Sequence, residues 1–445
     1  MAARLSPADA VWYLGETEQN PMVISTVLWL DGPLDVGLLR QRVAERVLER
    51  HPVFRSRIVP SRIPGRLPRW EDDDPDLDVH IRIVDLPPPG DHALLEARCS
   101  LERSTPLVRD RPLWTSTVYR GYRGDGTAIH TRVHHSLGDG IAFMRLFLTL
   151  CDEYSPDDIA LREPPTLAER AHDLGRRAAT LASDLLPPTR LLAEVGSAAR
   201  WTARIVLPDL VQPNILHGVP HGTKRMSWDP EGAPVERLKD VGAQVGATVN
   251  EVLLTIVTGA LHRYLVERDA LVDEVLVMVP VALRDPSAPL PRHLGNRIGV
   301  VPVHLPVGAT EPAERLAQVQ AQMEELKGSP APAISYLALA FSSLTTPPIG
   351  RSLHRINQLR STGVLTNVPG PSEQLHLGGV RVLGTVGWGG LTGDLNLSGS
   401  FISLGGRVFP GLVTDTAITD DPDRLLDHVR AEWSAATAAL AAPHG

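Results

Sequence analysis

Cysteine is nearly absent from this chain. Only two, Cys99 and Cys151, occur among 445 residues, too few for a disulfide framework or a thiolate zinc site, and this scarcity favours a reducing compartment. No stretch approaches the roughly 18 uninterrupted apolar residues that a membrane-spanning helix needs. The first residues, 1–7, lack the apolar core of a secretory signal. We therefore expect a cytoplasmic protein.

An excess of positive charge is also lacking, because the formal net charge is −8. This balance argues against nucleic acid as the main partner. The 43% hydrophobic and 22% charged residues are typical of a soluble globular protein. A chain of 445 residues exceeds one ordinary core, so we expect two domains of roughly 200 residues each.

One polar motif, His-His-Ser-Leu-Gly-Asp-Gly, stands out at 134–140. An alternating run before it predicts a strand at 127–133, and a periodic apolar run after it predicts a helix at 141–150. Successive side chains of a strand point to opposite faces. We therefore expect only one of His134 and His135 to face a cavity, and the other to be packed.

The acidic residue of the motif, Asp139, lies between Gly138 and Gly140. These glycines predict a sharp turn that holds the carboxylate inside it. Asp139 could orient the imidazole of a motif histidine, but a carboxylate in such a turn more naturally takes an arginine. Arg284, at the end of a predicted strand in the other half of the chain, is the expected partner.

A single positioned histidine is sufficient for acyl transfer, because it can take a proton from a hydroxyl and return it to a leaving group. The sequence has no Gly-x-Ser-x-Gly elbow and no reactive-looking cysteine, which favours direct transfer over a covalent acyl-enzyme. A metal site of His134, His135 and Asp139 is the other chemical interpretation. Strand geometry separates the two rings and no further ligand cluster is evident, so we expect no metal. Two ordinary histidines, one exposed and one hydrogen-bonded in a core, remain the simplest alternative.

The remaining patterns predict a mixed α/β domain at 1–155, a helical linker at 156–222 and a second mixed α/β domain at 223–445. In the linker, arginines alternate with leucines. That pattern fits either a helix face on a membrane or the solvated face of a packed helix. The clearest predicted strands are 23–30, 272–281, 298–305 and 380–386, and the clearest predicted helices are 35–50, 249–266, 312–326, 331–341 and 422–440.

Residues 134–140 match the His-His-x-x-x-Asp-Gly motif of the CoA-dependent acyltransferase superfamily. Further matches come in family order over nearly the whole chain, and in these the chain resembles the bacterial wax ester synthase/diacylglycerol acyltransferases. They are Leu5-Ser6-Pro7 with Asp9, Glu16, Pro21-Met22, Pro112-Leu113-Trp114, Ala247 to Val252, Pro280-Val281 with Arg284, Gly295-Asn296-Arg297 and Asn367 to Pro371.

By this resemblance the fold consists of two chloramphenicol-acetyltransferase-like α/β domains around a central tunnel, which acyl-CoA and the acceptor enter from different sides. The resemblance makes His135 the general base beside His134, and makes Asp139 structural, with Arg284 and Gly140 supporting the site. It places Asn250 and Glu16 near the site. Acyl-CoA is a substrate, and no cofactor is implied. The oxyanion donors are not identified by the sequence.

The implied activity is transfer of a fatty acyl group to diacylglycerol or a long-chain alcohol, giving triacylglycerol or wax ester, at the inner membrane or lipid bodies if the protein binds them peripherally. Some residues depart from the family pattern, such as Met22-Val23-Ile24-Ser25 in place of Met-His-Val-Gly and Asn250-Glu251 in place of Asn-Asp. Two alternatives therefore stay open. One is an acyltransferase of this fold with another acceptor or a carrier-bound acyl donor, and the other is a non-catalytic lipid-binding protein.

Overall fold

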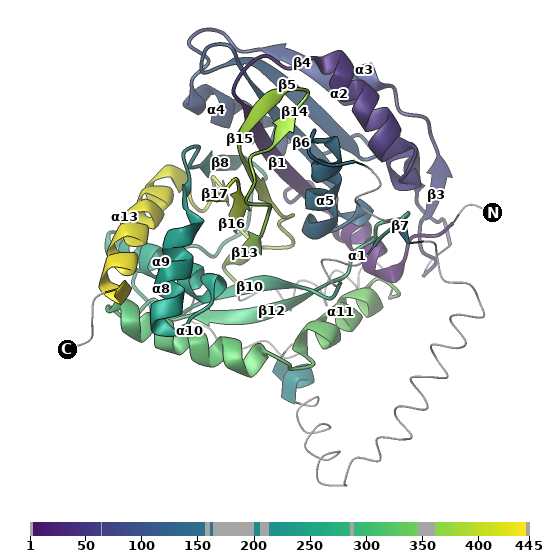
Figure 1. Cartoon of the computed structure of the whole chain (residues 1–445). Coiled ribbons are helices and arrows are strands. Elements are labelled where there is room, and N and C mark those ends of the chain that lie inside the picture. Colours follow the sequence, from purple (N-terminus) through teal and green to yellow (C-terminus); the bar gives the residue numbers. More distant parts are fainter. Residues whose placement is uncertain are drawn as a thin grey trace.

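Two β-sheets form the framework of the molecule, one in the upper part of Figure 1 and one in the middle. The computed structural model describes residues 3–63, 65–155, 161–162, 200–204, 213–284, 289–345 and 361–441. The predicted helical linker at 156–222 lies outside the described residues apart from 161–162, 200–204 and 213–222. The choice between a lipid-facing and a solvated linker therefore stays a prediction.

The first sheet has six strands in the order β14-β15-β1-β6-β5-β4. Its strands are β1 (Val23–Leu30), β4 (Ile81–Asp85), β5 (Trp114–Tyr122), β6 (Gly126–His134), β14 (His376–Leu377) and β15 (Val380–Trp388). The strands β5 and β6 form an antiparallel hairpin, and β1 pairs antiparallel with the other side of β6. The strand that carries the motif is thus central in its sheet.

Helices cover both faces of this first sheet. They are α1 (Pro7–Gly15), α2 (Val36–Val43), the π-helix η1 (Ala44–Leu48), the 3₁₀ turns η2 (Pro52–Arg55) and η3 (His135–Leu137), α3 (Leu77–His80), α4 (His92–Arg103) and α5 (Gly140–Leu150). A small separate sheet joins β2 (Ser56–Val59) to β3 (Arg69–Asp72). The predicted single helix at 35–50 is therefore an α-helix that continues as one π-helical turn.

The second sheet follows the order β12-β10-β13-β16-β17-β8, with β9 pairing on β17. Its strands are β8 (Lys224–Trp228), β9 (Ala233–Pro234), β10 (Val275–Ala282), β12 (Ile298–Leu305), β13 (Gly363–Val368), β16 (Leu397–Leu404) and β17 (Arg407–Asp415). Its helices are α8 (Val235–Val245), α9 (Val249–Val266), α10 (Pro312–Leu326), α11 (Ala331–Ser342) and α13 (Pro422–Ala441). A two-residue bridge pairs β7 (Leu161–Arg162) with β11 (Leu290–Pro291).

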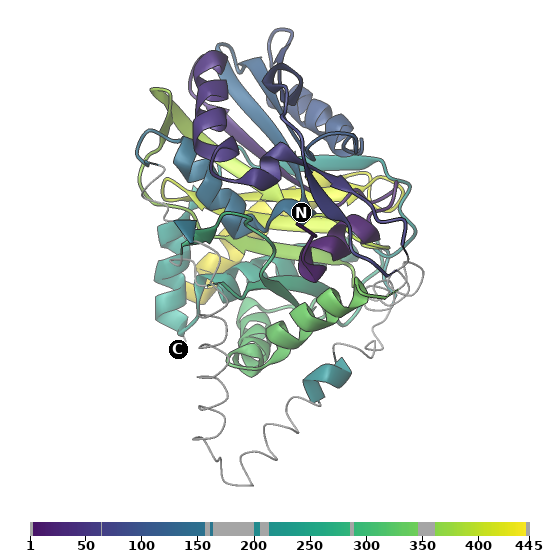
Figure 2. The ribbon, with the colours of Figure 1, turned by 90° about the vertical axis from the view of Figure 1, so that its right-hand side faces the viewer.

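The two sheets do not follow the predicted division at 222/223. The strands β14 and β15 belong to the C-terminal half of the sequence but complete the first sheet, where β15 pairs antiparallel with β1 from Ser25↔Trp388 to Leu30↔Val382. The chain then returns to the second sheet at β16. Figures 1 and 2 show this crossing strand between the purple-to-blue and the teal-to-yellow parts of the ribbon. The two halves are therefore interlocked through a shared sheet.

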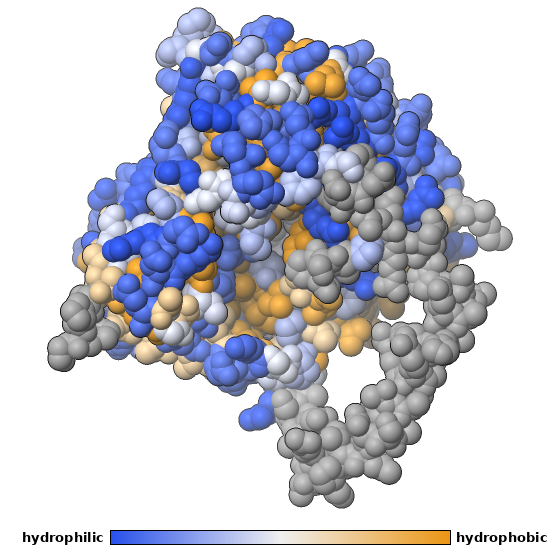
Figure 3. Space-filling model, viewed as in Figure 1, coloured by the Kyte–Doolittle hydropathy of each residue, from blue (hydrophilic) through white to orange (hydrophobic). Residues whose placement is uncertain are grey.

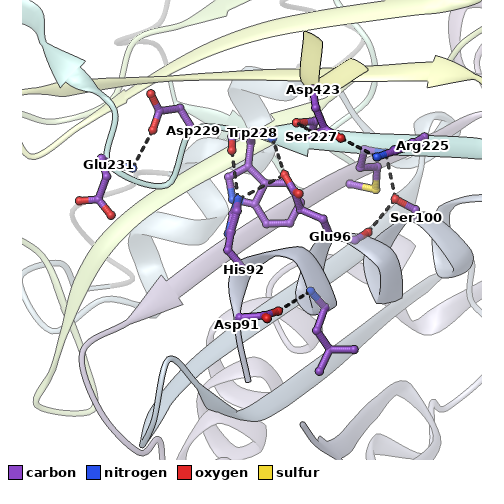
Figure 4. A network of polar contacts seen from close by, with 12 residues as sticks. Asp91, His92, Glu96, Ser100, Arg225, Ser227, Trp228, Asp229, Glu231 and Asp423 are labelled. Carbon is purple, nitrogen blue, oxygen red and sulfur yellow. Dashed lines mark hydrogen bonds and ion pairs between the residues drawn. The ribbon is translucent and has the colours of Figure 1, made fainter. Parts of the chain in front are cut away.

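Helix α4 of the first domain lies along β8, the last strand of the second sheet (Figure 4). Side chains four residues apart, on α4 and at its C-cap, accept hydrogen bonds from alternate N–H groups of β8: Glu96 from Trp228 at 2.9 Å, Ser100 from Met226 at 2.9 Å and the C-cap Ser104 from Lys224 at 2.8 Å. Four helical residues rise roughly 6 Å, and two strand residues roughly 6.7 Å. The two repeats match, so α4 takes the place of a neighbouring strand and protects the sheet edge.

Candidate active site

A cavity of about 390 Å³ lies between the two sheets and extends into the first domain. Its walls come from β1, β5, β6 and β15 on one side, from β10, β12 and β13 on the other, and from helices α2, α5 and α11. The lining is mainly apolar and includes His135, whereas His134 does not line it. The prediction that only one histidine of the motif faces a cavity is confirmed.

The position of His135 follows from the alternation of β6. Ile129, Thr131 and Val133 all line the cavity, and His135 comes next in this series of every second residue. The ring of Trp12, from α1, stacks on its imidazole with the ring centroids 3.9 Å apart and the planes 11° apart. The alternation of the strand therefore places the imidazole of His135 at the cavity, and the stacked indole of Trp12 fixes the orientation of its ring plane.

A chain of hydrogen bonds from the other domain fixes the tautomer of His135. Nδ1 of His135 lies 2.9 Å from Oδ1 of Asn296. The amide nitrogen of Asn296 donates both to Asp9 Oδ1 at 2.8 Å and to the carbonyl oxygen of His135 at 2.7 Å. Because both amide hydrogens have acceptors, the amide oxygen faces the ring, so Nδ1 carries the proton. Nε2 keeps its lone pair and has no hydrogen-bond partner among the described residues.

Burial keeps this imidazole uncharged. It lowers the pKa of His135 to about 4, although the nearby carboxylate of Asp139 and the bond to Asn296 act in the opposite direction. The neutral form is therefore the form present near pH 7. Burial also raises the pKa of Asp9, against the bonds from Ser6 and Asn296. His135 is thus a neutral base whose free nitrogen is available to a bound hydroxyl group.

His134 has a different environment, away from the cavity. Its Nδ1 accepts from the backbone N–H of Ser136 at 3.1 Å and lies 2.7 Å from the hydroxyl of the same residue. Its Nε2 lies 3.5 Å from Glu16 Oε1. Burial raises the pKa of Glu16, but the contacts with His134 and Arg109 outweigh it and lower this pKa to about 2. Glu16, predicted near the site, therefore lies beside the packed histidine and holds it as an ionised carboxylate.

Asp139 has the structural place that was expected, but with different partners. One carboxylate oxygen caps α5 by accepting from Ala142 N at 3.0 Å, and the other accepts from Arg297 N at 3.0 Å. The predicted pairing with Arg284 is wrong: Arg284 donates to the backbone carbonyls at 294–295, at 2.9 and 3.1 Å, and no ion pair joins it to Asp139 within the described part of the chain. Two backbone N–H groups already occupy the carboxylate, so the arginine instead braces the turn that carries Asn296.

The motif glycines Gly138 and Gly140 do not form a left-handed turn. Gly138 is extended, with φ 170°, and Gly140 begins α5 and lines the cavity. Neither has a φ in the left-handed region, so the predicted turn between β6 and α5, which holds the carboxylate of Asp139, does not depend on the conformational freedom of glycine. Gly138 instead forms a parallel bridge with Gly295 of the other domain. A Cβ atom on Gly138 would lie 3.4 Å from the ring of Phe143, an ordinary van der Waals distance, so the bridge joins the two domains beside the base without requiring glycine at position 138.

Asn250 lies away from the cavity, contrary to the prediction. It occupies the first turn of α9, and no residue of that helix lines the cavity. Thr248 and Glu251 form a capping box around it, with Thr248 N donating to the Glu251 carboxylate at 2.7 Å. The run that resembled a family motif is therefore a helix start. By contrast, Asn367 of the last motif does line the cavity.

Two residues of this site, Asn296 and Asp9, were not predicted to be functional. Both lie within motifs quoted for the family resemblance, which was the only signal in the sequence. Their sequence separation from each other is 287 residues, and Asn296 is 161 residues from His135. Among the described residues, no group of three or more histidine, cysteine, aspartate or glutamate side chains is arranged to hold a metal ion.

Two mixed α/β domains around a cavity, with one histidine nitrogen free to act as a base, form the architecture that the resemblance predicted. Solved structures support this fold. The wax ester synthase/diacylglycerol acyltransferase from Marinobacter aquaeolei VT8 matches with a TM-score of 0.67 and 24% identity, over 98% of each chain. The first condensation domain of the CDA synthetase matches with a TM-score of 0.64 and 19% identity, over 99% of this chain and 97% of that one.

Sequence comparison gives the family. The model described as the wax ester synthase/diacylglycerol acyltransferase catalytic domain matches residues 5–253, and that of the WS/DGAT C-terminal domain matches residues 294–435. A Mycobacterium tuberculosis protein named as a diacylglycerol O-acyltransferase is 31% identical over 458 residues, covering 96% of each chain. The chain belongs to the wax ester synthase/diacylglycerol acyltransferase family, and it is an acyltransferase. The predicted resemblance is confirmed.

Proposed function

We propose that this protein moves a fatty acyl group from acyl-CoA to the hydroxyl of diacylglycerol or a long-chain alcohol, giving triacylglycerol or wax ester. The observation that carries the proposal is the free Nε2 of a neutral His135 in a largely apolar cavity. The names of the relatives support the same acceptor class. Acyl-CoA is a substrate in this reaction, and the reaction needs no bound cofactor.

The reaction follows from the geometry of His135. Its Nε2 takes the proton of the acceptor hydroxyl as the oxygen attacks the thioester carbonyl, forming the new C–O bond. The imidazolium keeps its Nδ1–H on Asn296 Oδ1, which holds the ring in place during the transfer. When the tetrahedral intermediate collapses, the C–S bond breaks and Nε2 returns the proton to the CoA thiolate. The apolar walls exclude water, which would otherwise hydrolyse the thioester.

A lipid surface is the further partner that we propose. Leu337 and Phe341 of α11 are 63% and 64% exposed, and Leu344 follows at 49%. The opposite side of the same helix, with Ala338 and Leu339, lines the cavity. Figure 3 shows hydrophobic residues around the hollow between the domains and along its lower rim, where α11 lies. A helix that lines a lipid-binding cavity and is apolar on its outer side suits the place where lipid substrates enter.

No single described helix is long and apolar enough to cross a membrane, although α8 and α9, bent by 100°, pass that test as a pair.

Flotation with phosphatidylcholine vesicles containing diacylglycerol tests whether the exposed apolar side of α11 binds a lipid surface. The double variant Leu337→Ser/Phe341→Ser should float less than the parent protein while releasing CoA normally with a short soluble alcohol. Equal flotation of both proteins would show that α11 does not bind the protein to the lipid surface.

Release of CoA thiol from palmitoyl-CoA tests the reaction itself. The purified protein is assayed with diacylglycerol, with hexadecanol and without acceptor, beside His135→Ala and the exposed-histidine control His221→Ala. We expect release to require an acceptor, to fall about 10²- to 10⁴-fold in His135→Ala and to stay unchanged in His221→Ala. Release with non-lipid alcohols or carrier-bound donors alone would favour the alternative acyltransferase. Acyl-CoA binding without turnover under any condition would favour a lipid-binding protein.

A further inference from the structure

The cavity continues from His135 into the core of the first domain. There it runs between the face of the first sheet and the helical wall of α2, η1 and α5, which contributes Leu39, Val43, Val47 and Leu150. We call this part the inner arm. The rest of the cavity, the interdomain arm, lies against β10, β12 and α11. A folded domain normally fills such a space between sheet and helices, so the inner arm needs an explanation.

The sheet side of the inner arm has its shortest side chains in one cross-strand row. Ser116, Thr131, Thr26 and Gly387 are direct neighbours on β5, β6, β1 and β15. All four line the cavity. A Cβ atom on Gly387 would lie only 2.9 Å from Thr26 Cγ2 and 3.2 Å from Ile402 Cδ1. Larger residues precede and follow this row along the strands, such as Val133 and Ile129. The hollow is therefore kept open where the row passes under the helices.

The inner arm has the direction and length of an extended chain. Thr131 is four residues before His135 and Ile129 six, at most roughly 13 Å and 20 Å at the rise of a strand, because β6 ends at His134 and His135 begins η3. The arm thus begins at the reacting nitrogen and runs back along the strand beneath α5. A chain whose carbonyl carbon lies at His135 would pass over the row of small residues and end near the wall formed by α2.

The shape of the two arms decides which substrate each can take. The inner arm is enclosed between one sheet and one layer of helices, a space that suits one unbranched chain. Diacylglycerol carries two acyl chains, which need the interdomain arm beneath α11 with its exposed apolar rim. An acyl-CoA carries a single acyl chain. We propose that the inner arm binds the acyl chain of acyl-CoA, and that the row through Thr131 sets the chain length that the enzyme accepts. This assignment rests on the proposed function.

Substitutions that fill the inner arm test the assignment. In Thr131→Leu, and separately in Ser116→Leu, kcat/KM for palmitoyl-CoA should fall at least about tenfold relative to octanoyl-CoA with the acceptor held constant. The preference among alcohols of different length at a fixed acyl-CoA should not change. Thr131→Val is the matched control, because it removes the hydroxyl without adding length. Ala338→Leu, in the interdomain arm, should shift the acceptor preference instead.

Two outcomes would overturn the assignment. A changed alcohol preference with an unchanged acyl preference in Thr131→Leu would place the acceptor in the inner arm. Unchanged preferences for both substrates, in variants with parental thermal unfolding curves, would mean that no substrate enters the inner arm.

Photo-crosslinking with palmitoyl-CoA bearing a terminal diazirine is a second test, and it does not depend on turnover. Labelling should fall on residues 36–48, so the arm can be tested even if the proposed acceptors give no product, and labelling confined to 331–342 would contradict it.

Discussion

The two faces of the first sheet differ in chemistry although they alternate along the same strand. On β6, Ile129, Thr131 and Val133 face the cavity, whereas His130 and Arg132 face α4. On the α4 face, each of these two side chains is bonded to a fixed partner, although His130 Nε2 and Arg132 Nε are buried without one. His130 Nδ1 lies 2.7 Å from Glu102 Oε2, and Arg132 donates to the carbonyl oxygen of Thr105 at 2.7 Å. On the cavity face, the reactive nitrogen of His135 has no protein partner among the described residues.

This difference shows how β6 can stabilise the sheet through one face and carry the active site on the other. Hydrogen bonds on the α4 face hold β6 in place. On the opposite face, Nε2 of His135 can therefore stay free and the cavity can stay unfilled. Each histidine of the pair His134-His135 takes the role of its own face. The ring of His134 is bonded to Ser136 and close to Glu16, and that of His135 is held only at Nδ1. The predictions below test whether the two roles separate.

The largest expected effect is on the pH dependence of the reaction. Protonation of His135 removes the lone pair that accepts the proton, and burial lowers its pKa to about 4. We expect kcat/KM to hold down to about pH 5 and then to fall about tenfold per pH unit below the pKa. Between the ordinary histidine pKa and about 4, the unfolded chain binds a proton that the folded chain does not, so stability falls as the pH falls. Circular dichroism at each pH must therefore show folded protein, and an acid limb near the ordinary pKa would contradict the buried neutral base.

Removal of the group that orients the base should have the next largest effect. Asn296→Ala leaves Nδ1 without its acceptor, and a misplaced imidazole should lower kcat about 10²-fold with little change in KM. Asn296→Asp is the sharper variant, because a carboxylate at this place favours the imidazolium and should move the acid limb to higher pH. If kcat fell in both variants but the acid limb stayed fixed in Asn296→Asp, Asn296 would only join the domains.

The sequence predicted elements better than contacts. The bounds of β1, β12 and α10 were predicted at the residues where the structure has them, because their apolar periods are regular and turn residues flank them. Strand alternation also predicted that only one of the two histidines faces the cavity, whereas the choice of His135 came from the family resemblance. Contacts over long separations could not be predicted this way. Strand patterns gave Arg284 as the partner of Asp139, but they do not report which backbone N–H groups reach a carboxylate first.

The same limit explains what was missed in the site and in the domain division. No local pattern shows that Asn296 meets His135, because a turn of the second domain brings it there through the bridge of Gly138 and Gly295. Nor does a pattern show which sheet a strand joins. The apolar alternation of β15 is the same whether it pairs with β1 or with strands of its own half. Secondary structure follows from local periods, whereas the site depends on packing between domains.

The smallest expected effect lies on the α4 face and should leave the chemistry untouched. Burial lowers the pKa of His130 despite the adjacent carboxylate, so a neutral imidazole donates to ionised Glu102. Burial raises the pKa of Glu102, but the contacts with His130, Thr117 and Arg132 outweigh it and lower this pKa to about 2. Glu102→Gln replaces a charged acceptor by a neutral one and should cost about 2 kcal/mol of unfolding free energy near neutral pH.

The pH dependence of the stability lost in Glu102→Gln shows whether the loss comes from the contact between His130 and ionised Glu102 or from a general packing defect. A carboxylate with a lowered pKa stabilises the fold above its ordinary pKa, and this contribution is lost as the pH falls toward about 2. The difference in unfolding free energy between the parent protein and Glu102→Gln, measured with urea, should therefore be largest above about pH 5 and should decrease as the pH falls. The acid limb of kcat/KM should be the same in both proteins, because Glu102 and His135 act on opposite faces of β6. A shifted limb would show that the two faces are coupled, and the division of roles along this strand would then be wrong.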